Sequence, residues 1–255
     1  MNSIKINLVL RNPYEVYKAL LNDGAVKRWH KFISDYYLPP QEKRVLLFYP
    51  CSAKKPYTIS RSYRMLFKTL KKLGEKRSLI HVVTVSEPFA LVPEEFYNNN
   101  SKWHNWKDDW YDCPGLFEWW CRRHGEAYDR HYAEKCLNIL SNVVASFLKR
   151  LRAHHLSRDL LLIGFIRTYS SSLRITLNNT HRIILERAMK KSNTSIILLP
   201  TKSFVKSLIK RKGRAAWDFY GVAHPESQKY LLRKLQTMLK LMYKRNSYIS
   251  KPSDH

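Results

Sequence analysis

Four short apolar runs, spread along the chain, constrain its fold more than any other feature. They span residues 45–49, 79–85, 160–166 and 195–199 and are rich in β-branched and aromatic side chains. Helical patterns lie between and after them, at residues 62–73, 126–153, 172–191 and 225–244. Strands that alternate with helices are typical of a parallel sheet covered on both faces. We therefore expect an α/β protein, a three-layer αβα sandwich with a four-stranded parallel sheet.

The flanking segments complete the expected domain organisation. Residues 1–40 carry one or two short helices that end before Pro39 and Pro40, and we expect them to brace the sheet. Residues 41–245 then form the core domain and residues 246–255 a flexible tail. The apolar runs are too short to span a bilayer and no targeting segment is visible, so we expect a cytoplasmic protein. The four cysteines form no C-x-x-C pair and are expected to be reduced thiols.

The segment 50–60 is the first candidate for a functional site. It directly follows the first apolar run, which places it at the carboxyl end of a buried strand. In open α/β sheets ligands bind outside those strand ends, where the amides that open the next helix can hold an anion. The segment brings a thiol, two ammonium groups, a phenol and a hydroxyl to this position, from Cys51, Lys54, Lys55, Tyr57 and Ser60.

The charge of the chain indicates a polyanionic partner. Lys and Arg total 46 against 20 Asp and Glu, a formal net charge of +26. Nucleic acid is the usual partner of such a field, because Lys and Arg neutralise phosphates and release counterions. A basic run after the last strand is either a solvated face or a phosphate-binding rim. Together with Lys54 and two arginines near a neighbouring strand end, this rim would comprise Lys202, Lys206, Lys210, Arg211, Lys212, Arg214, Arg167 and Arg174.

The 50–60 segment also resembles a known family. Pro50-Cys51, three residues, Lys55-Pro56-Tyr57, two residues and then Ser60 are similar to the signature of the archaeosine synthase core domain. The segment from Ser86-Glu87-Pro88 to Val92-Pro93-Glu94-Glu95 resembles that family's second strand end. The family pattern continues to a histidine three residues after the serine, where this chain has Tyr63.

The resemblance implies a defined reaction on tRNA. The family joins free lysine, through its side-chain amine, to the nitrile of a 7-cyano-7-deazaguanine base in tRNA, and the resemblance brings no cofactor with it. The implied partners are tRNA, free lysine and a separate transglycosylase-like subunit, PUA-type subunit or radical enzyme, with no membrane. The implied catalytic residues are Cys51, Lys55, Tyr57 and Ser60, and the implied substrate contacts include Pro50, Pro56, Ser86 and Glu87.

The family core in turn resembles the uracil-DNA glycosylase fold. Lys55-Pro56-Tyr57 stands where such glycosylases have Asp-Pro-Tyr, and His224-Pro225-Glu226-Ser227 resembles their late His-Pro-Ser loop. A lysine cannot activate water as a carboxylate does, although it can polarise a nitrile or steer a phosphate. We therefore exclude simple glycosidic hydrolysis. His224 either caps a helix or contacts the base or its phosphates.

For some candidate residues two interpretations remain, one functional and one structural. Cys51 either adds to a nitrile as a thiolate, giving a thioimidate that an amine displaces, or packs beneath the turn. The stretch 103–112 is either a lid, in which Asp108 and Asp109 receive the amino group of a substrate, or a loop anchored by its tryptophans. No metal is expected, because the spacing of the remaining thiols and imidazoles matches no zinc pattern, in Cys113, Cys121, His124, His131 and Cys136.

Three functions remain open at this point. The first is a tRNA-modifying enzyme of the archaeosine synthase type, which transfers lysine to the base. The second is a non-catalytic RNA-binding subunit or paralogue of a modification complex, which Tyr63 favours because it replaces a group able to carry a proton. The third is a DNA-acting, glycosylase-like protein.

Overall fold

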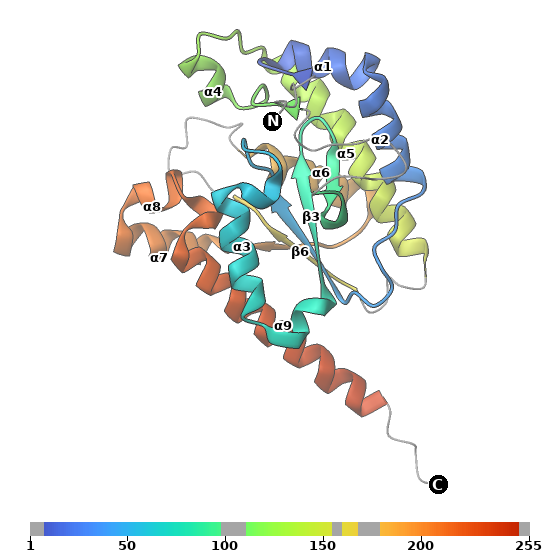
Figure 1. Ribbon diagram of the computed structural model, residues 1–255, viewed down its shortest axis with the longest axis vertical. Coiled ribbons are helices and arrows are strands. Elements are labelled where there is room, and N and C mark those ends of the chain that lie inside the picture. The colour runs from blue at the N-terminus through green and yellow to red at the C-terminus, as the bar shows by residue number, and fades with distance from the viewer. Residues whose placement is uncertain (1–7, 98–110, 155–159, 168–178, 250–255) are drawn as a thin grey trace, which may run out of the picture.

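A five-stranded mixed sheet lies at the centre of the computed structural model (Figure 1), which describes residues 8–97, 111–154, 160–167 and 179–249. The strand order is β4-β3-β2-β6-β7. These strands are β4 (Ala90–Pro93), β3 (Ile80–Ser86), β2 (Val45–Pro50), β6 (Leu161–Phe165) and β7 (Ile197–Leu199). The four predicted strands are β2, β3, β6 and β7, and they are parallel to one another.

The prediction of a four-stranded, all-parallel sheet is wrong by one strand. After Ser86 the chain reverses direction, Ala90 adopts a φ of 62°, and β4 returns antiparallel to β3. The apolar run of β4 is short and lies between Pro88 and Pro93, so its pattern is that of a turn rather than of a strand. The α/β class is confirmed, whereas the likeness to uracil-DNA glycosylases stays a prediction.

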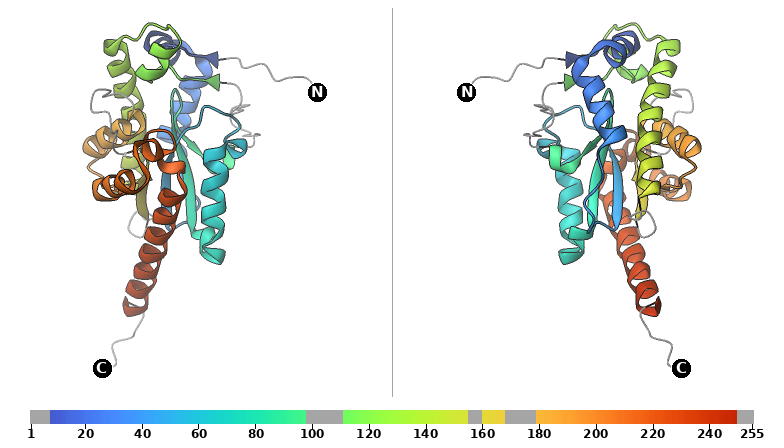
Figure 2. Two further views of the ribbon diagram at one scale, coloured as in Figure 1. Left: turned by 90° about the vertical axis from the view of Figure 1, so that its left-hand side faces the viewer. Right: turned by 90° about the vertical axis from the view of Figure 1, so that its right-hand side faces the viewer.

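Helices cover both faces of the sheet (Figure 2). On one face Tyr49 of β2 reaches two helices, because its hydroxyl lies 3.0 Å from Ser62 Oγ and accepts from Gln228 Nε2 at 3.3 Å. On the other face a Cβ on Gly164 of β6 would lie 3.1 Å from Leu185, so this glycine lets its helix approach the sheet. The first face carries α3 (Arg61–Lys71) and α9 (Pro225–Ile249), and the second carries α5 (Arg130–Ala153) and α6 (Thr180–Ser192). The helices α1 (Pro13–Asn22) and α2 (Gly24–Asp35) contact α5.

The N-terminal helices lie beside α5. Both α1 and α2 pack along α5, outside the sheet, and α2 ends before the double proline. The helix α9 continues to Ile249, past the predicted start of the tail at residue 246. The division into domains stays a prediction. None of the helices among the described residues is long and apolar enough to cross a membrane.

Several short elements had no prediction. The strands β1 (Leu8–Val9) and β5 (Tyr111–Asp112) pair in parallel as a separate two-stranded sheet. Among the described residues, one short helix follows β5 and two follow β7. They are α4 (Glu118–Arg123), α7 (Lys202–Lys212) and α8 (Arg214–Asp218), and short 3₁₀ helices occur at η1 (Tyr57–Ile59), η2 (Gly74–Leu79), η3 (Glu94–Phe96) and η6 (Gly221–Ala223).

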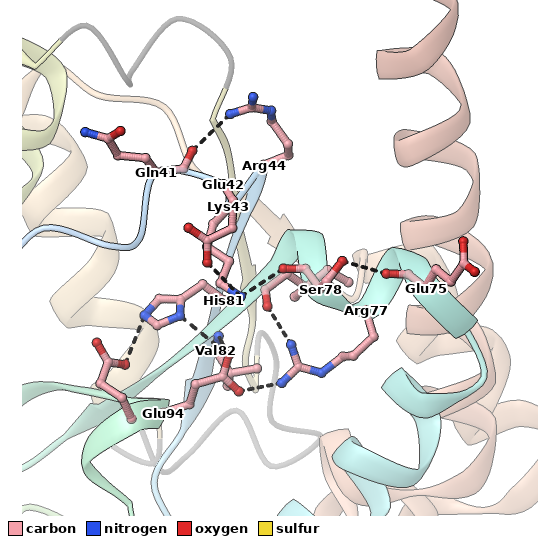
Figure 3. Close-up of polar contacts among 12 residues, drawn as sticks. Gln41, Glu42, Lys43, Arg44, Glu75, Arg77, Ser78, His81, Val82 and Glu94 are labelled. Atoms are coloured by element: carbon pink, nitrogen blue, oxygen red, sulfur yellow. Dashed lines mark hydrogen bonds and ion pairs between the residues drawn. The ribbon is translucent and has the colours of Figure 1, made fainter.

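A polar network lies at the amino-terminal edge of the sheet (Figure 3). His81 Nδ1 lies 3.5 Å from Glu94 Oε1, and Arg77 donates to Glu94 Oε2 at 2.5 Å. Burial alone would raise the pKa of Glu94, but His81 and Arg77 outweigh it and lower that pKa. Glu95 also contacts His81, at 3.3 Å. Glu94 and Glu95 therefore stabilise the amino-terminal ends of the strands, on the side of the sheet opposite to the end of β2.

Candidate active site

Cys51 follows directly after β2, the strand at the centre of the sheet. Its amide donates to Val85 O of β3 at 3.0 Å, so the backbone is fixed by the sheet itself. The preceding carbonyl, Pro50 O, accepts from the Tyr63 hydroxyl at 3.2 Å. The Cys51 thiol is half-buried, and its position at the strand end agrees with the prediction.

Two further side chains converge on this thiol from elements far apart in the sequence. Glu87 follows β3 and is 1% exposed, and its Oε2 lies 3.7 Å from Cys51 Sγ. His181 lies in the first turn of α6 and is 7% exposed. Its Nε2 lies 3.3 Å from Cys51 Sγ and 3.2 Å from Glu87 Oε2. These three residues form the candidate site, which we call the Cys51 triad.

The triad is electrostatically coupled. Burial opposes a positive charge on His181, but the Glu87 carboxylate and the Cys51 sulfur outweigh it and raise the pKa of His181 to about 10. Burial likewise opposes the charge on Glu87, but His181 and the Thr180 hydroxyl lower the pKa of Glu87. Thr180 Oγ1 lies beside the carboxylate without completing a well-aligned hydrogen bond. At neutral pH the triad therefore holds an imidazolium against a carboxylate and the sulfur.

One ring nitrogen serves both acidic partners. His181 Nε2 faces the sulfur and the carboxylate, so a single N–H is shared between them. With Nε2 deprotonated, each of the three side chains would offer a lone pair, and the three donor atoms lie within 4.8 Å of one another. Tetrahedral zinc, with bonds of about 2.0–2.3 Å, needs donor separations of about 3.3–3.6 Å. The observed separations of 3.2, 3.3 and 3.7 Å lie close to this range, two of them just outside it.

The triad is also the cluster of possible metal ligands found among the residues that the structure describes. A cysteine, a histidine and a carboxylate suit zinc better than magnesium or calcium, which prefer oxygen ligands. The sequence predicts no metal, because it offers no zinc spacing. The three ligands come from three different elements, so sequence spacing could not reveal them. The predicted absence of a metal stays a prediction.

Buried hydroxyl groups lie beside the triad. Tyr57 is fully buried, and its hydroxyl contacts Ser86 Oγ at 3.0 Å and the Tyr111 hydroxyl. Burial and the neighbouring Tyr111 raise the pKa of Tyr57, so the phenol stays protonated. The Lys55 ammonium lies 4.4 Å from the centre of the Tyr111 ring. Burial raises the pKa of Cys113, which also responds to Glu87, Lys55 and Cys51, so these groups share one region.

Ser60 and Tyr63 hold the backbone of the motif. Ser60 is 2% exposed and caps α3, because its Oγ accepts from the Tyr63 amide at 3.2 Å. Tyr63 is fully buried, and its hydroxyl also contacts Thr84 Oγ1. The centres of the Tyr63 and Tyr57 rings lie 5.0 Å apart. Both residues therefore position the strand end that carries Cys51. The predicted catalytic role of Ser60 stays a prediction, as does that of Lys55 and Tyr57.

The remaining predicted contacts differ in position. Pro56 precedes the single turn η1, and Lys54 is exposed. His224 accepts from the Glu226 amide through Nδ1 at 3.1 Å, which is the capping role that we considered. Burial lowers the pKa of His224. Asp108, Asp109 and Arg174 lie outside the described residues.

The predicted basic rim is divided between α7, α8 and the end of β6. All six of its cations on α7 and α8 are exposed, namely Lys202, Lys206, Lys210, Arg211, Lys212 and Arg214. Arg167, by contrast, is part-buried and donates to Trp217 O at 2.7 Å and to Asp218 O. Arg167 therefore fixes the end of α8 to the sheet through Nη2. Its predicted role in binding phosphate stays a prediction.

His181 is the one member of the triad that the sequence analysis did not single out. It lies inside the predicted helix 172–191, nine residues after the predicted start. The structure places it in the first turn of α6, which follows β6, a neighbour of β2 in the sheet. Parallel strands end on the same side of a sheet, so a residue early in that helix can reach Cys51, but the predicted helix start hides this signal.

Comparison with known proteins supports the family resemblance over part of the chain. Residues 26–109 match a family model described as a domain of unknown function, DUF5591. Archaeosine synthase subunit alpha of Thermococcus kodakarensis is 38% identical over 84 residues, which are 32% of this chain and 15% of that protein. Archaeosine synthase of Methanocaldococcus jannaschii is 24% identical over 135 residues, which are 52% of this chain and 18% of that protein.

The chain thus spans less than a fifth of the length of these relatives. A crystal structure of AF0587, a protein of unknown function, covers 69% of this chain and 44% of its own, with 16% identity and a TM-score of 0.38. That likeness is too low to support an argument. The segment 26–109 includes Cys51 and Glu87 but not His181. The resemblance to the archaeosine synthase family is confirmed by these matches.

Proposed function

From this family resemblance we propose that the chain is a tRNA-modifying component of the archaeosine synthase type, and that its Cys51 triad adds lysine to a nitrile. The substrate would be a 7-cyano-7-deazaguanine base in tRNA, with free lysine as the second substrate. The proposed mechanism depends mainly on one observation: Cys51 Sγ lies 3.3 Å from His181 Nε2 at the end of the central strand.

In the first step Cys51 acts as the nucleophile. The sulfur attacks the nitrile carbon as a thiolate, a C–S bond forms, and one π pair of the nitrile moves to nitrogen. That nitrogen takes a proton from the His181 imidazolium, which stands beside the sulfur and is charged at neutral pH. The product is a thioimidate on Cys51, and His181 is left neutral beside the Glu87 carboxylate.

In the second step the lysine amine displaces the thiol. The amine attacks the thioimidate carbon, the C–S bond breaks, and the amine proton returns through His181 to the triad. The base then carries an amidine linked to lysine, and Cys51 is regenerated. No oxidant or reductant is needed, because bonds to carbon, nitrogen and sulfur are exchanged without net electron transfer.

The charge of the chain supports a tRNA substrate. The six exposed cations of α7 and α8 lie on helices that follow β7, and the triad lies at the carboxyl ends of the strands beside it. Phosphate contacts of this kind contribute affinity with little sequence information. Relatives named as a subunit alpha favour a chain that acts with others, and a transglycosylase-like, PUA-type or radical-enzyme partner would supply the remaining steps.

The test is lysine transfer measured by mass spectrometry. Purified protein, with candidate partner proteins, is incubated with tRNA bearing the nitrile base and isotopically labelled lysine. We expect a mass gain of one lysine on the base with wild-type protein, none with Cys51→Ala, and a rate lower by about 10²–10⁴-fold with His181→Gln. Cys121→Ala is the matched control, because that buried thiol contacts Arg11 O and Gly115 O rather than the triad.

A covalent adduct distinguishes the proposed mechanism from simple positioning of lysine. Without lysine, wild-type protein and the nitrile nucleoside should give a protein mass increase that Cys51→Ala lacks. Absence of both transfer and adduct, while tRNA still binds, would instead favour the non-catalytic RNA-binding subunit.

A further inference from the structure

We propose that the turn between α8 and η6 presents a stacking platform for an unpaired nucleobase, built on Phe219 and Tyr220. This inference rests on the proposed function, because it assumes that the ligand is RNA. Phe219 is 84% exposed and Tyr220 is 46% exposed. Phenylalanine is often fully buried, whereas here two adjacent aromatic rings are exposed in one turn.

The platform stands on an anchored backbone. The Phe219 amide donates to Ala215 O at 3.0 Å, closing the last turn of α8. Trp217 is fully buried, and Arg167, just past the end of β6, donates to its carbonyl. The exposed ring of Phe219 therefore projects from a segment that the core holds in place, and stacking would cost little backbone entropy.

Tyr220 lies close to the residues that follow the 50–60 segment. The Arg61 guanidinium lies 5.2 Å from the centre of the Tyr220 ring, and Arg61 is the first residue of α3, directly after Ser60. The Tyr220 ring also lies 6.0 Å from the His224 ring, at 65°. In addition η6 packs against α3. The platform thus lies at the edge of the sheet at which β2 ends and Cys51 is located.

The charge around the platform complements a nucleic acid. Residues 202–214 contain six Lys or Arg and no Asp or Glu, and α7 packs against α8. A flexible strand could place phosphates along α7 and one base on Phe219, which is how single-stranded nucleic acids are commonly held. Every base offers a π-face, so the platform would select unpaired nucleotides rather than a sequence. It would hold a nucleotide near the one that reacts.

A membrane surface is the competing occupant, since cations with an exposed aromatic ring also suit a lipid interface. Two observations favour RNA. The exposed rings form a pair on a turn after a five-residue helix, rather than an apolar face along an amphipathic helix. The neighbouring Arg61 already uses a ring face as a cation contact, a geometry that also suits a base between an aromatic ring and a guanidinium.

The test compares variants of the full chain binding to a fluorescent, unstructured RNA oligonucleotide and to tRNA. We expect Phe219→Ala to weaken binding by about 5- to 100-fold and Phe219→Trp to retain it, because tryptophan restores a stacking surface. The dependence of affinity on salt should stay unchanged in Phe219→Ala, whereas Lys206→Ala with Lys210→Ala should reduce it. Tyr36→Ala is the control, since Tyr36 is 57% exposed on the distant α2 end.

If the affinity of Phe219→Ala for either RNA lies within about twofold of the wild-type affinity, the platform is wrong. Loss of binding to vesicles of phosphatidylcholine and phosphatidylserine, with RNA affinity unchanged, would also overturn it and identify a lipid contact. Lysine transfer is scored separately. Failure of transfer with intact, Phe219-dependent RNA binding would contradict the proposed function and leave the platform standing.

Discussion

Replacing Glu87 with glutamine should destabilise the protein in a way that depends on pH. The change is nearly isosteric, but it removes the carboxylate that lies 3.2 Å from His181 Nε2 and leaves an imidazolium buried without its partner. The rise in the pKa of His181 from 6.5 to about 10 corresponds to about 5 kcal/mol. Breaking buried ion pairs typically costs about 3–5 kcal/mol. We expect Glu87→Gln to lower the free energy of unfolding by that amount near pH 6.

The direction of the pH dependence follows from the two pKa shifts. The folded-state pKa of His181 is raised, so its contribution is fully present below pH 6.5 and is lost as pH rises toward about 10. The pKa of Glu87 is lowered, so its contribution is present above its ordinary value and is lost as pH falls. The difference between wild type and Glu87→Gln should therefore be largest at mildly acidic pH and shrink in alkaline solution.

The assay is urea unfolding of the full chain at several pH values between about 5 and 10, followed by circular dichroism. Cys51 Sγ also contacts His181 Nε2, so each variant is made in a Cys51→Ser background that removes this second contact. The double variant Glu87→Gln with His181→Gln isolates the coupling between the pair. A cost of less than about 1 kcal/mol for Glu87→Gln at pH 6 would contradict a stabilising ion pair between Glu87 and His181. So would an NMR titration that gives His181 its ordinary pKa.

Two further predictions concern the same edge of the sheet. Zinc should raise the melting temperature of the wild-type protein and inhibit lysine transfer, and a chelator should reverse both effects. Cys51→Ser should weaken zinc binding by more than about tenfold, and unchanged binding by this variant in calorimetry would contradict the site. Tyr63→Phe should lower the free energy of unfolding by about 1–3 kcal/mol, because Pro50 O loses the hydroxyl that donates to it. Tyr63→His should lower it further without raising the rate of lysine transfer. A faster transfer rate in Tyr63→His would instead show that position 63 moves a proton.

The sheet was largely predictable from the sequence, because its strands are continuous apolar runs of β-branched and aromatic residues. Val45–Pro50 and Ile80–Ser86 are buried almost throughout, as expected for parallel strands covered on both faces. The antiparallel strand β4 was not predictable in the same way. Its pairing depends on the reversal after Ser86 and on Ala90 at positive φ, neither of which the apolar pattern encodes.

The site was half predictable for a different reason. Cys51 and Glu87 each follow a recognisable strand directly, so their position could be read from local sequence. His181 lies inside the predicted helix 172–191 rather than directly after a strand, and it is one of ten histidines. Only the packing of α6 against the sheet, which Gly164 permits, identifies it as the partner of Cys51.

The order of the strands explains why the triad forms where it does. From β2 the chain passes to β3 on one side, and later returns to place β6 on the other side of β2. At such a reversal the connections that leave neighbouring strands diverge, and a crevice opens beyond the carboxyl ends. Cys51 lies at the end of β2, Glu87 after β3, and His181 at the start of the helix that follows β6. The topology thus brings the three residues together independently of any family motif, and residues 26–109, which match the family model, supply only two of them.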